Sequence, residues 1–339
     1  MKKIITLCSA FLVLFLLSSC FQKLGGSLNK AQNGLVAYKN SKHHLFVGFL
    51  VGDGNDPAAS FNPANAPDSV DFLEFFAGRD TTTANWRIAQ AKGTRIIACH
   101  FPHDAYFDGS IKDPATKIPG YINPAGFDQY HPNASSTYDH WARDTYNQEI
   151  VKEALDGIDI DIESGTFGKD VPNTATNGKN LLLAVAKYYG PNCTQCIVGA
   201  NGKKPVFFYD TDGSAKFEDT MYTAYRNNYD YVLFQSYTTG SHSWRGRGIR
   251  GFKPLVDFYG LEKLIFLVNG DSFLYANGKQ DRAPQDSIAT ADLINYATWV
   301  KTNNGVGVGA YRMSRDYNHN PPFAISRQAI QIMNPAPRR

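Results

Sequence analysis

The sequence predicts a (β/α)8 barrel, on three observations. Short apolar runs alternate with helical patterns from residue 44 onward. The pair of a strand and a helix recurs about eight times over roughly 300 residues, which is typical of this fold. No glycine-rich phosphate loop follows the first run, as a doubly wound sheet would favour. A GxGxxG-like stretch near the C-terminus, "GVGVGAY", opens no strand-helix-strand unit. It is better explained by glycines in a last barrel strand.

The strands follow from the apolar runs. Each run is short and rich in β-branched or aromatic residues, which are common in strands. The predicted strands cover residues 44–51, 69–76, 94–101, 155–163, 204–210, 229–237, 263–269 and 305–312. Eight runs of this length are enough to close a barrel.

The helices follow from apolar residues spaced three or four apart. We expect them at residues 81–93, 136–154, 178–190, 214–228 and 290–305. Gly93 and Gly190 suit helix ends, and Thr290 suits an N-cap. Long segments follow the third and fourth strands. In a barrel both would lie at the C-terminal face, where loops form the active site.

Composition indicates one large domain with a substantial core. The chain has 339 residues, of which 43% are hydrophobic and 19% charged. Its net charge is +3, and Lys and Arg are scattered along the chain. A nucleic-acid-binding protein would concentrate these charges on one surface. We therefore expect no nucleic acid partner.

The N-terminus resembles a bacterial lipoprotein leader. Lys2 and Lys3 precede an apolar run over residues 4–17 and the sequence "LSSC", which ends at Cys20. We expect a signal peptide at 1–19, a flexible tether at 20–40 after lipidated Cys20, and the barrel domain at 41–339. The alternative is an ordinary cleaved signal peptide with an incidental cysteine. Without an Asp after Cys20, the outer membrane is favoured over the inner, with the periplasmic or the surface face left open.

The remaining cysteines suggest structural roles. Cys99 lies in the apolar run "RIIACHF" and is expected in the core. Cys193 and Cys196 have CxxC spacing without a second pair of Cys or His that would complete a zinc site. In an exported protein a local disulfide is favoured, with free thiols as the alternative.

The fourth predicted strand, "LDGIDIDIE", holds the main chemical signal. Side chains alternate along a strand, so Asp159, Asp161 and Glu163 share one face while the intervening isoleucines share the other. With the isoleucines under the helices, the acids point into the barrel. Burial and like charge raise carboxyl pKa values, so the acids should share at least one proton near neutral pH. Glu163, at the C-terminal end of the strand, is then the candidate general acid.

Two other interpretations of the acids are weaker. A purely structural ladder would cost stability, because neutral residues fill a core better. Metal binding would leave a poor coordination shell, because one strand supplies all the ligands. We therefore expect no metal and no cofactor.

"DGIDIDIE" resembles the DGxDxDxE signature of glycoside hydrolase family 18, a family of (β/α)8 barrels. The resemblance implies that Glu163 is the proton donor and that Asp161 orients the 2-acetamido group of the substrate. It also implies that Asp159 shares a proton with Asp161. The implied mechanism is substrate-assisted: the acetamido oxygen attacks the anomeric carbon, an oxazolinium forms, and configuration is retained. Asp156 falls on the other face, which favours a structural role.

The sixth predicted strand carries "FQSY", in which Gln235 and Tyr237 share one face. By the same resemblance Tyr237 donates a hydrogen bond to the acetamido carbonyl, with a core tyrosine as the alternative. The Gln-x-Tyr pattern is more similar to endo-β-N-acetylglucosaminidases, which cut the chitobiose core of N-glycans, than to chitinases. A chitinase and a non-catalytic glycan-binding lipoprotein stay as alternatives.

Further candidates for substrate binding lie at predicted strand ends, and each could instead serve a loop or an ion pair. A monomer is expected. The candidates are Gln235, Tyr209, Asp210, Asn269, Asp271, Tyr311, Arg312 and His100, the last of which has metal-like spacing to His103.

Overall fold

The structure is a computed structural model that describes most of the predicted barrel. The described residues are 33–52, 57–76, 83–102, 135–163, 174–199, 202–213, 225–237, 252–270 and 286–336, with Thr166, Tyr222 and Phe273. Cys20, His103 and Asp271 lie outside them, as do most of the long segments after the third and fourth strands. The predictions for those positions therefore stay predictions.

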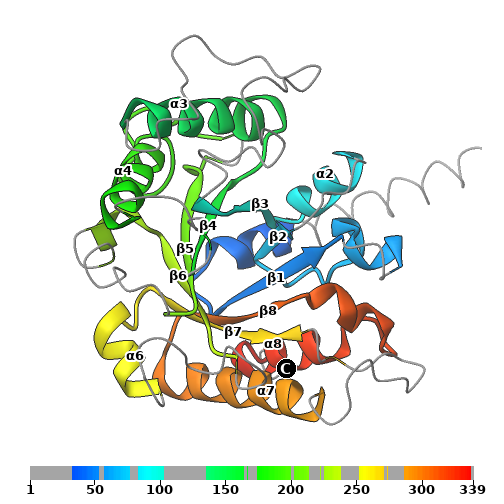
Figure 1. The fold of residues 1–339 in the computed structure, drawn as a ribbon. Helices are drawn as coiled ribbons and strands as arrows, with labels where there is room; N and C mark the ends of the chain where they lie inside the picture. The colour runs from blue at the N-terminus through cyan, green and yellow to red at the C-terminus, as the bar shows by residue number, and fades with distance from the viewer. Residues whose placement is uncertain are drawn as a thin grey trace, which may run out of the picture.

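Eight parallel strands close into a barrel, which confirms the predicted fold class. Figure 1 shows the strands at the centre with the helices around them. The ring closes where β8 pairs with β1, with Leu45 opposite Gly307. The strands are β1 (Leu45–Val51), β2 (Phe72–Phe76), β3 (Arg95–His100), β4 (Gly157–Ile162), β5 (Val206–Thr211), β6 (Tyr231–Gln235), β7 (Leu264–Asn269) and β8 (Gly307–Tyr311).

Helices cover the outside of the strands. They are α2 (Thr83–Ala91), α3 (Ser135–Tyr146), which continues as the π-helix η4 (Asn147–Lys152), α4 (Thr174–Ala186), α6 (Phe252–Tyr259), α7 (Asp286–Asn303) and α8 (Ala324–Met333). Short 3-10 turns are η1 (Ala58–Phe61), η2 (Pro63–Asn65), η5 (Arg226–Asn228) and η8 (Met313–Asn318).

The helix boundaries partly match the sequence patterns. Gly93 and Gly190 both have φ of +87°, a left-handed conformation that favours glycine after a helix. The prediction that Thr290 caps a helix was wrong, because α7 already begins at Asp286. Helices α6 and α8 were not predicted.

The core has two layers, separated by the strand ring. The outer layer packs strand side chains such as Ile158, Ile160 and Ile162 against the helices. The inner layer lies inside the barrel and includes Val47 and Phe208. The isoleucines of β4 therefore face outward as predicted, and the intervening acids face inward.

The glycines of β8 serve close packing inside the barrel. A Cβ on Gly307 would lie 2.2 Å from the carbonyl oxygen of Leu45, and one on Gly309 would lie 2.6 Å from Leu267 Cδ2 and from the Val47 carbonyl oxygen. Neither position has room for a side chain. This supports the interpretation of "GVGVGAY" as strand glycines.

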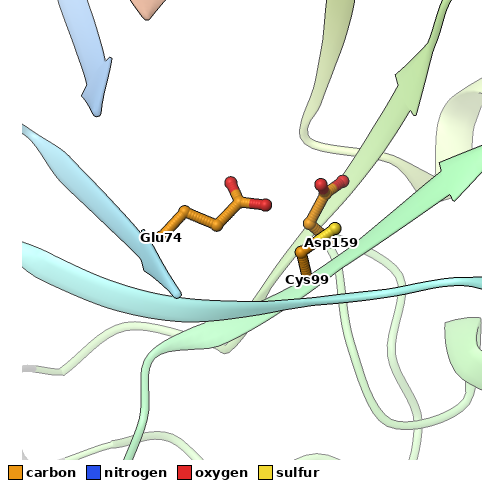
Figure 2. Close-up of side chains that lie close together, drawn as sticks. All are labelled: Glu74, Cys99 and Asp159. Carbon is orange, nitrogen blue, oxygen red and sulfur yellow. The ribbon is translucent and has the colours of Figure 1, made fainter. Parts of the chain in front are cut away.

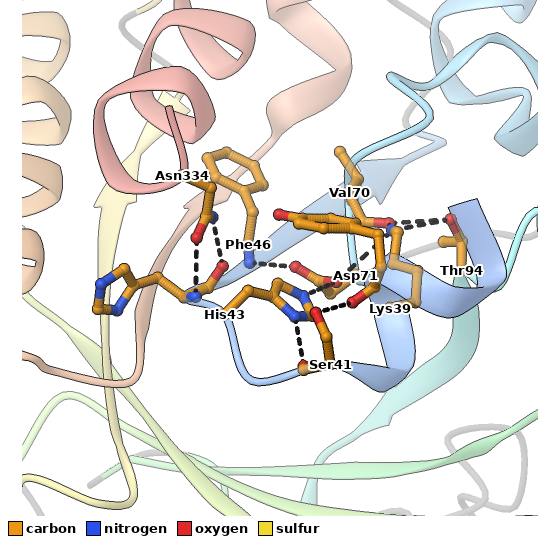
Figure 3. A network of polar contacts seen from close by, with 10 residues as sticks. Lys39, Ser41, His43, Phe46, Val70, Asp71, Thr94 and Asn334 are labelled. Carbon is orange, nitrogen blue, oxygen red and sulfur yellow. Dashed lines mark hydrogen bonds and ion pairs between the residues drawn. The ribbon is translucent and has the colours of Figure 1, made fainter. Parts of the chain in front are cut away.

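A polar network ties the chain before β1 to the N-terminal end of the barrel (Figure 3). Residues 33–40 are helical, and the buried ammonium of Lys39 lies 3.6 Å from Asp71 Oδ1. Asp71 also contacts His43 Nε2 at 2.8 Å and accepts a hydrogen bond from the Phe46 amide at 2.9 Å. The helix at 33–40 lies within the segment 20–40 that was predicted to be a tether.

Cys193 and Cys196 are joined by a disulfide, which confirms the pairing favoured from their CxxC spacing. The bond lies in the segment between α4 and β5, where the Cys193 amide donates to the Gly190 carbonyl at 3.3 Å. Among the described residues, no helix is both long enough and apolar enough to span a lipid bilayer.

Candidate active site

Four carboxyl groups converge inside the barrel near the C-terminal ends of β4 and β5. Asp159 and Asp161 are buried on the inner face of β4, and Glu163 follows directly after the strand with a partly exposed side chain. Asp210 on β5 is in register with Asp161 and is also buried. The structure therefore brings together the three predicted acids of β4 and one of the predicted strand-end groups.

The amide of Gln235, on β6, links three of these carboxyls. Its Nε2 donates to Glu163 Oε1 at 3.0 Å, to Asp161 Oδ1 at 3.1 Å and to Asp210 Oδ1 at 3.3 Å. A neutral donor among acids stabilises negative charge without adding a cation. Gln235 was predicted to bind substrate, and its contacts indicate that it also orients the acids.

The backbone at Glu163 is held by a turn. Its amide donates to Thr166 Oγ1 at 3.0 Å, and its carbonyl accepts from the Thr166 amide at 3.2 Å. These bonds fix where the Glu163 side chain leaves the strand. Thr166 was not among the residues predicted from the sequence, although a hydroxyl residue three positions after Glu163 is a common turn signal.

Burial and like charge control the protonation of the site. Burial, then the charges of Asp210 and Glu163, raise the pKa of Asp161 well above its usual range. The pKa of Asp210 rises for similar reasons, first burial and then Asp159, although the Gln235 hydrogen bond opposes the rise. These directions support the predicted proton sharing along the acids.

Aromatic side chains border the acids inside the barrel. Tyr237 packs in the inner layer, with its ring centroid 6.4 Å from that of Tyr311. Burial, followed by the charges of Asp210 and Asp161, raises the pKa of the Tyr237 phenol, which keeps it a hydrogen-bond donor at neutral pH. Asn269, the last residue of β7, pairs in register with Tyr311. By alternation from Ile265 and Leu267 its side chain also faces inward.

Other predicted binding residues lie elsewhere. Tyr209 is fully buried in the outer layer, against Tyr222 and Tyr229, so the prediction that it contacts substrate is corrected. Its neighbours on β5, Phe208 and Asp210, face inward, and strand alternation turns Tyr209 the other way.

His100 also differs from the sequence-based expectation. His100 Nε2 lies 2.9 Å from Glu149 Oε1 on η4, and its ring meets Trp141 of α3 edge-on. His100 therefore faces the helices, which corrects its assignment as a sugar ligand. Arg312 follows β8 and is buried, with a left-handed backbone (φ 55°) just before η8. Its role in substrate binding stays a prediction.

A further acid, Glu74 on β2, was missed by the sequence analysis. It is fully buried, and its carboxylate lies within 4.8 Å of both Asp159 and Cys99 Sγ (Figure 2). A single charged residue in the apolar run "SVDFLEFF" was the available signal, because its even spacing from Phe72 and Phe76 predicts an inward side chain. Glu74, Cys99 and Asp159 are also of the types that bind metals. Two buried acids need only a shared proton to coexist, so the cluster does not require a metal.

A cavity of about 710 Å³ opens at the opposite end of the barrel. Gly93, Thr94, Arg95 and Asp156 line it, all at the N-terminal ends of β3 and β4. In this fold catalysis occurs at the C-terminal ends of the strands, and the acids lie there. We therefore place the active site at the acids and not in this cavity.

A closed parallel barrel whose fourth strand ends in a buried acid ladder and a partly exposed glutamate defines a (β/α)8 glycoside hydrolase. The family profile described as the endo-β-N-acetylglucosaminidase EndoS TIM-barrel domain matches residues 107–309. The chain therefore belongs to the family of endo-β-N-acetylglucosaminidase TIM-barrel domains.

Two curated relatives are named endo-β-N-acetylglucosaminidases. The chain is 27% identical over 345 residues to endo-β-N-acetylglucosaminidase F2 of Elizabethkingia meningoseptica, an alignment that covers 93% of this chain and 89% of the relative. It is 27% identical over 180 residues to an endo-β-N-acetylglucosaminidase of Bifidobacterium longum subsp. infantis, which covers 53% of this chain and 29% of that one.

Solved structures share the fold. An endo-β-N-acetylglucosaminidase from Cordyceps militaris superposes with a TM-score of 0.59 and 18% identity, covering 90% of this chain and 95% of that one. The catalytic domain of a family GH18 chitinase from the fern Peteris ryukyuensis gives a TM-score of 0.52 with 15% identity, covering 85% and 98%. At these identities the likeness concerns the fold alone.

Proposed function

We propose that this protein cleaves the β-1,4 bond within the N,N'-diacetylchitobiose core of N-glycans. The chain is a glycosidase of the endo-β-N-acetylglucosaminidase kind. The observation that supports the specific reaction best is the Gln235 amide, which joins the proton donor Glu163 to Asp161 and Asp210.

The mechanism we propose is substrate-assisted and retaining. Glu163, at the open end of the acid ladder, protonates the leaving glycosidic oxygen. The acetamido oxygen of the substrate attacks the anomeric carbon, and the bond to the leaving oxygen breaks. Asp161 stabilises the positive charge that develops on the acetamido nitrogen, and the Tyr237 phenol donates to the acetamido oxygen. Water then opens the oxazolinium, with Glu163 as the base.

The test is release of glycan from a glycoprotein such as ribonuclease B, followed by mass spectrometry. The wild-type protein should remove the glycan and leave one N-acetylglucosamine on the asparagine. Turnover of chitotriose without that mass loss would instead favour a chitinase. Binding of glycans without any turnover would favour a non-catalytic glycan-binding protein.

Glu163→Gln should abolish turnover and keep glycan affinity, because the amide fills the same space and cannot protonate the leaving group. We expect kcat to fall by about 10²-fold or more, measured on the same glycoprotein. The matched control is Glu262→Gln, an exposed glutamate in the turn before β7 at the other end of the barrel. Equal loss of turnover and of affinity in the Glu163 variant would argue against the acid role.

We also propose that Cys20 is lipidated and that the protein is anchored in the outer membrane. Support comes from the "LSSC" sequence at Cys20, which resembles a lipobox. A lipid anchor would hold the barrel at the membrane with its active site accessible to large glycoproteins.

A further inference from the structure

Glu74 and Asp159 form a pair of buried carboxyls at the inner end of the acid ladder (Figure 2). Both side chains are fully buried, on β2 and β4. Among the described residues, no N–H or O–H group donates to any of their four carboxyl oxygens. The amide of Gln235 is committed to the outer three acids. Any N–H or O–H donor to the carboxyl oxygens of Glu74 and Asp159 therefore has to come from the pair itself.

Two adjacent buried carboxyls cannot both stay ionised, because each charge opposes the other and neither is solvated. A protonated carboxylic acid has one O–H donor. One proton held between the pair supplies a donor to one acid and an acceptor on the other. The half-buried thiol of Cys99 adds a weak donor beside them.

Resting on the proposed function, we propose that Glu74 is a positioning residue that stays protonated and donates its O–H to Asp159. Asp159 can then carry negative charge when the proton that it shares with Asp161 moves toward Asp161. That proton stays between Asp159 and Asp161, and Asp161 meets Glu163 through the Gln235 amide, which donates to both. No oxidant, metal or second reactant is needed.

The charges around Glu74 support this assignment. The groups that face it are Asp159 and Asp161 from β4, Asp210 from β5 and Cys99 from β3. Burial raises the pKa of Glu74 well above its usual range, and the charges of Asp210 and Asp161 raise it further. The pKa of Asp159 is raised in turn, first by burial and then by Glu74. The charge of His100 opposes this rise in the pKa of Asp159.

The first experiment compares glycan release from ribonuclease B by wild type, Glu74→Gln and Glu74→Leu. Gln keeps an N–H donor at the same place, so kcat should stay within about threefold of wild type. Leu removes the donor, so kcat should fall by about 10- to 100-fold with KM nearly unchanged. Equal activity of the two variants, whether high or low, would overturn the proposal. Wild-type protein that releases no glycan would instead overturn the proposed function.

The second experiment does not depend on activity. Wild-type Glu74 stays protonated in the folded state and ionises in the unfolded state, so its contribution to stability is lost as pH rises above the unfolded pKa. The melting temperature of Glu74→Gln relative to wild type should therefore increase from pH 5 to pH 8. A difference that does not change with pH would contradict a protonated Glu74. A wild-type melting temperature that rises with added zinc, and does not in Glu74→Gln, would also contradict it by revealing a metal site.

Discussion

At the scale of single residues, the amide of Gln235 decides how charge is distributed among the acids. It is the described side-chain amide that reaches Asp161, Glu163 and Asp210 together. One amide nitrogen has two hydrogens, so the three acceptors compete for two donors. Protonation of one acid relieves that competition. The Gln235 amide and the shared proton therefore both influence which of the three carboxyls carries negative charge.

Gln235→Leu should lower kcat by about 10- to 100-fold, because hydrogen bonds to charged groups contribute about 1.5 to 3 kcal/mol. The measurement is glycan release from ribonuclease B under saturating substrate. Gln328→Leu is the matched control, since Gln328 is exposed on α8. A Gln235→Leu enzyme with wild-type turnover would show that the amide has no part in catalysis.

At the scale of elements, the network around Asp71 joins the helix at 33–40 to the entry of β1 and β2. Lys39 donates to the Val70 carbonyl, and Thr94 Oγ1 donates to the same carbonyl at 2.9 Å. Asn334, just after α8, accepts from the His44 amide at 3.0 Å and donates to its carbonyl at 2.7 Å. Segments from both ends of the described chain therefore meet at the N-terminal end of the barrel (Figure 3).

Asp71→Ala should reduce the free energy of unfolding by about 3 to 5 kcal/mol, because it leaves the buried Lys39 charge without its partner. Chemical denaturation measures this loss. Lys42→Met, an exposed lysine in the same segment, is the control and should change stability little. A loss below about 1 kcal/mol for Asp71→Ala would show that the buried Lys39 ammonium does not depend on its ion pair with Asp71.

The same network predicts a pH effect at His43. Burial alone would lower the pKa of His43, but the hydrogen bond and charge of Asp71 raise it above its usual value. The stability that this pair contributes is therefore complete below the unfolded pKa of histidine and is lost as pH rises through the folded value. The contact between His43 and Asp71, which holds the segment before β1, therefore contributes least to stability in alkaline solution.

At the scale of the whole molecule, the proposed lipid anchor can be tested separately from the activity of the barrel. Cys20 lies outside the described residues, and its lipidation is a proposal that a substitution at this position tests. Cys20→Ser should move the protein from the membrane fraction to the soluble fraction of the producing cells, without changing glycan release by the purified protein. Fractionation and immunoblotting measure the shift. A Cys20→Ser variant that stays in the membrane fraction would contradict lipidation at this position.

Much of the fold was predictable because strand and helix patterns are local. All eight strands were located within a few residues, since each is a short apolar run next to turn residues. Helix α8 was missed, although Ile325, Ala329 and Met333 have helical spacing. The Thr290 cap was wrong because α7 begins at Asp286, one turn before Thr290, and already includes the apolar pair Ile288 and Ala289.

The sequence by itself determined which face of β4 carries the acids, because side-chain alternation is a property of every strand. It could not show that Glu74, Asp210 and Gln235 meet those acids, because they come from β2, β5 and β6, and only the closed ring sets their register. It also assigned Tyr209 and His100 to the site from their position near strand ends. In the tertiary structure both side chains point toward the helices. Successive side chains on a strand point to opposite faces, and the neighbours of Tyr209 and His100 point into the barrel.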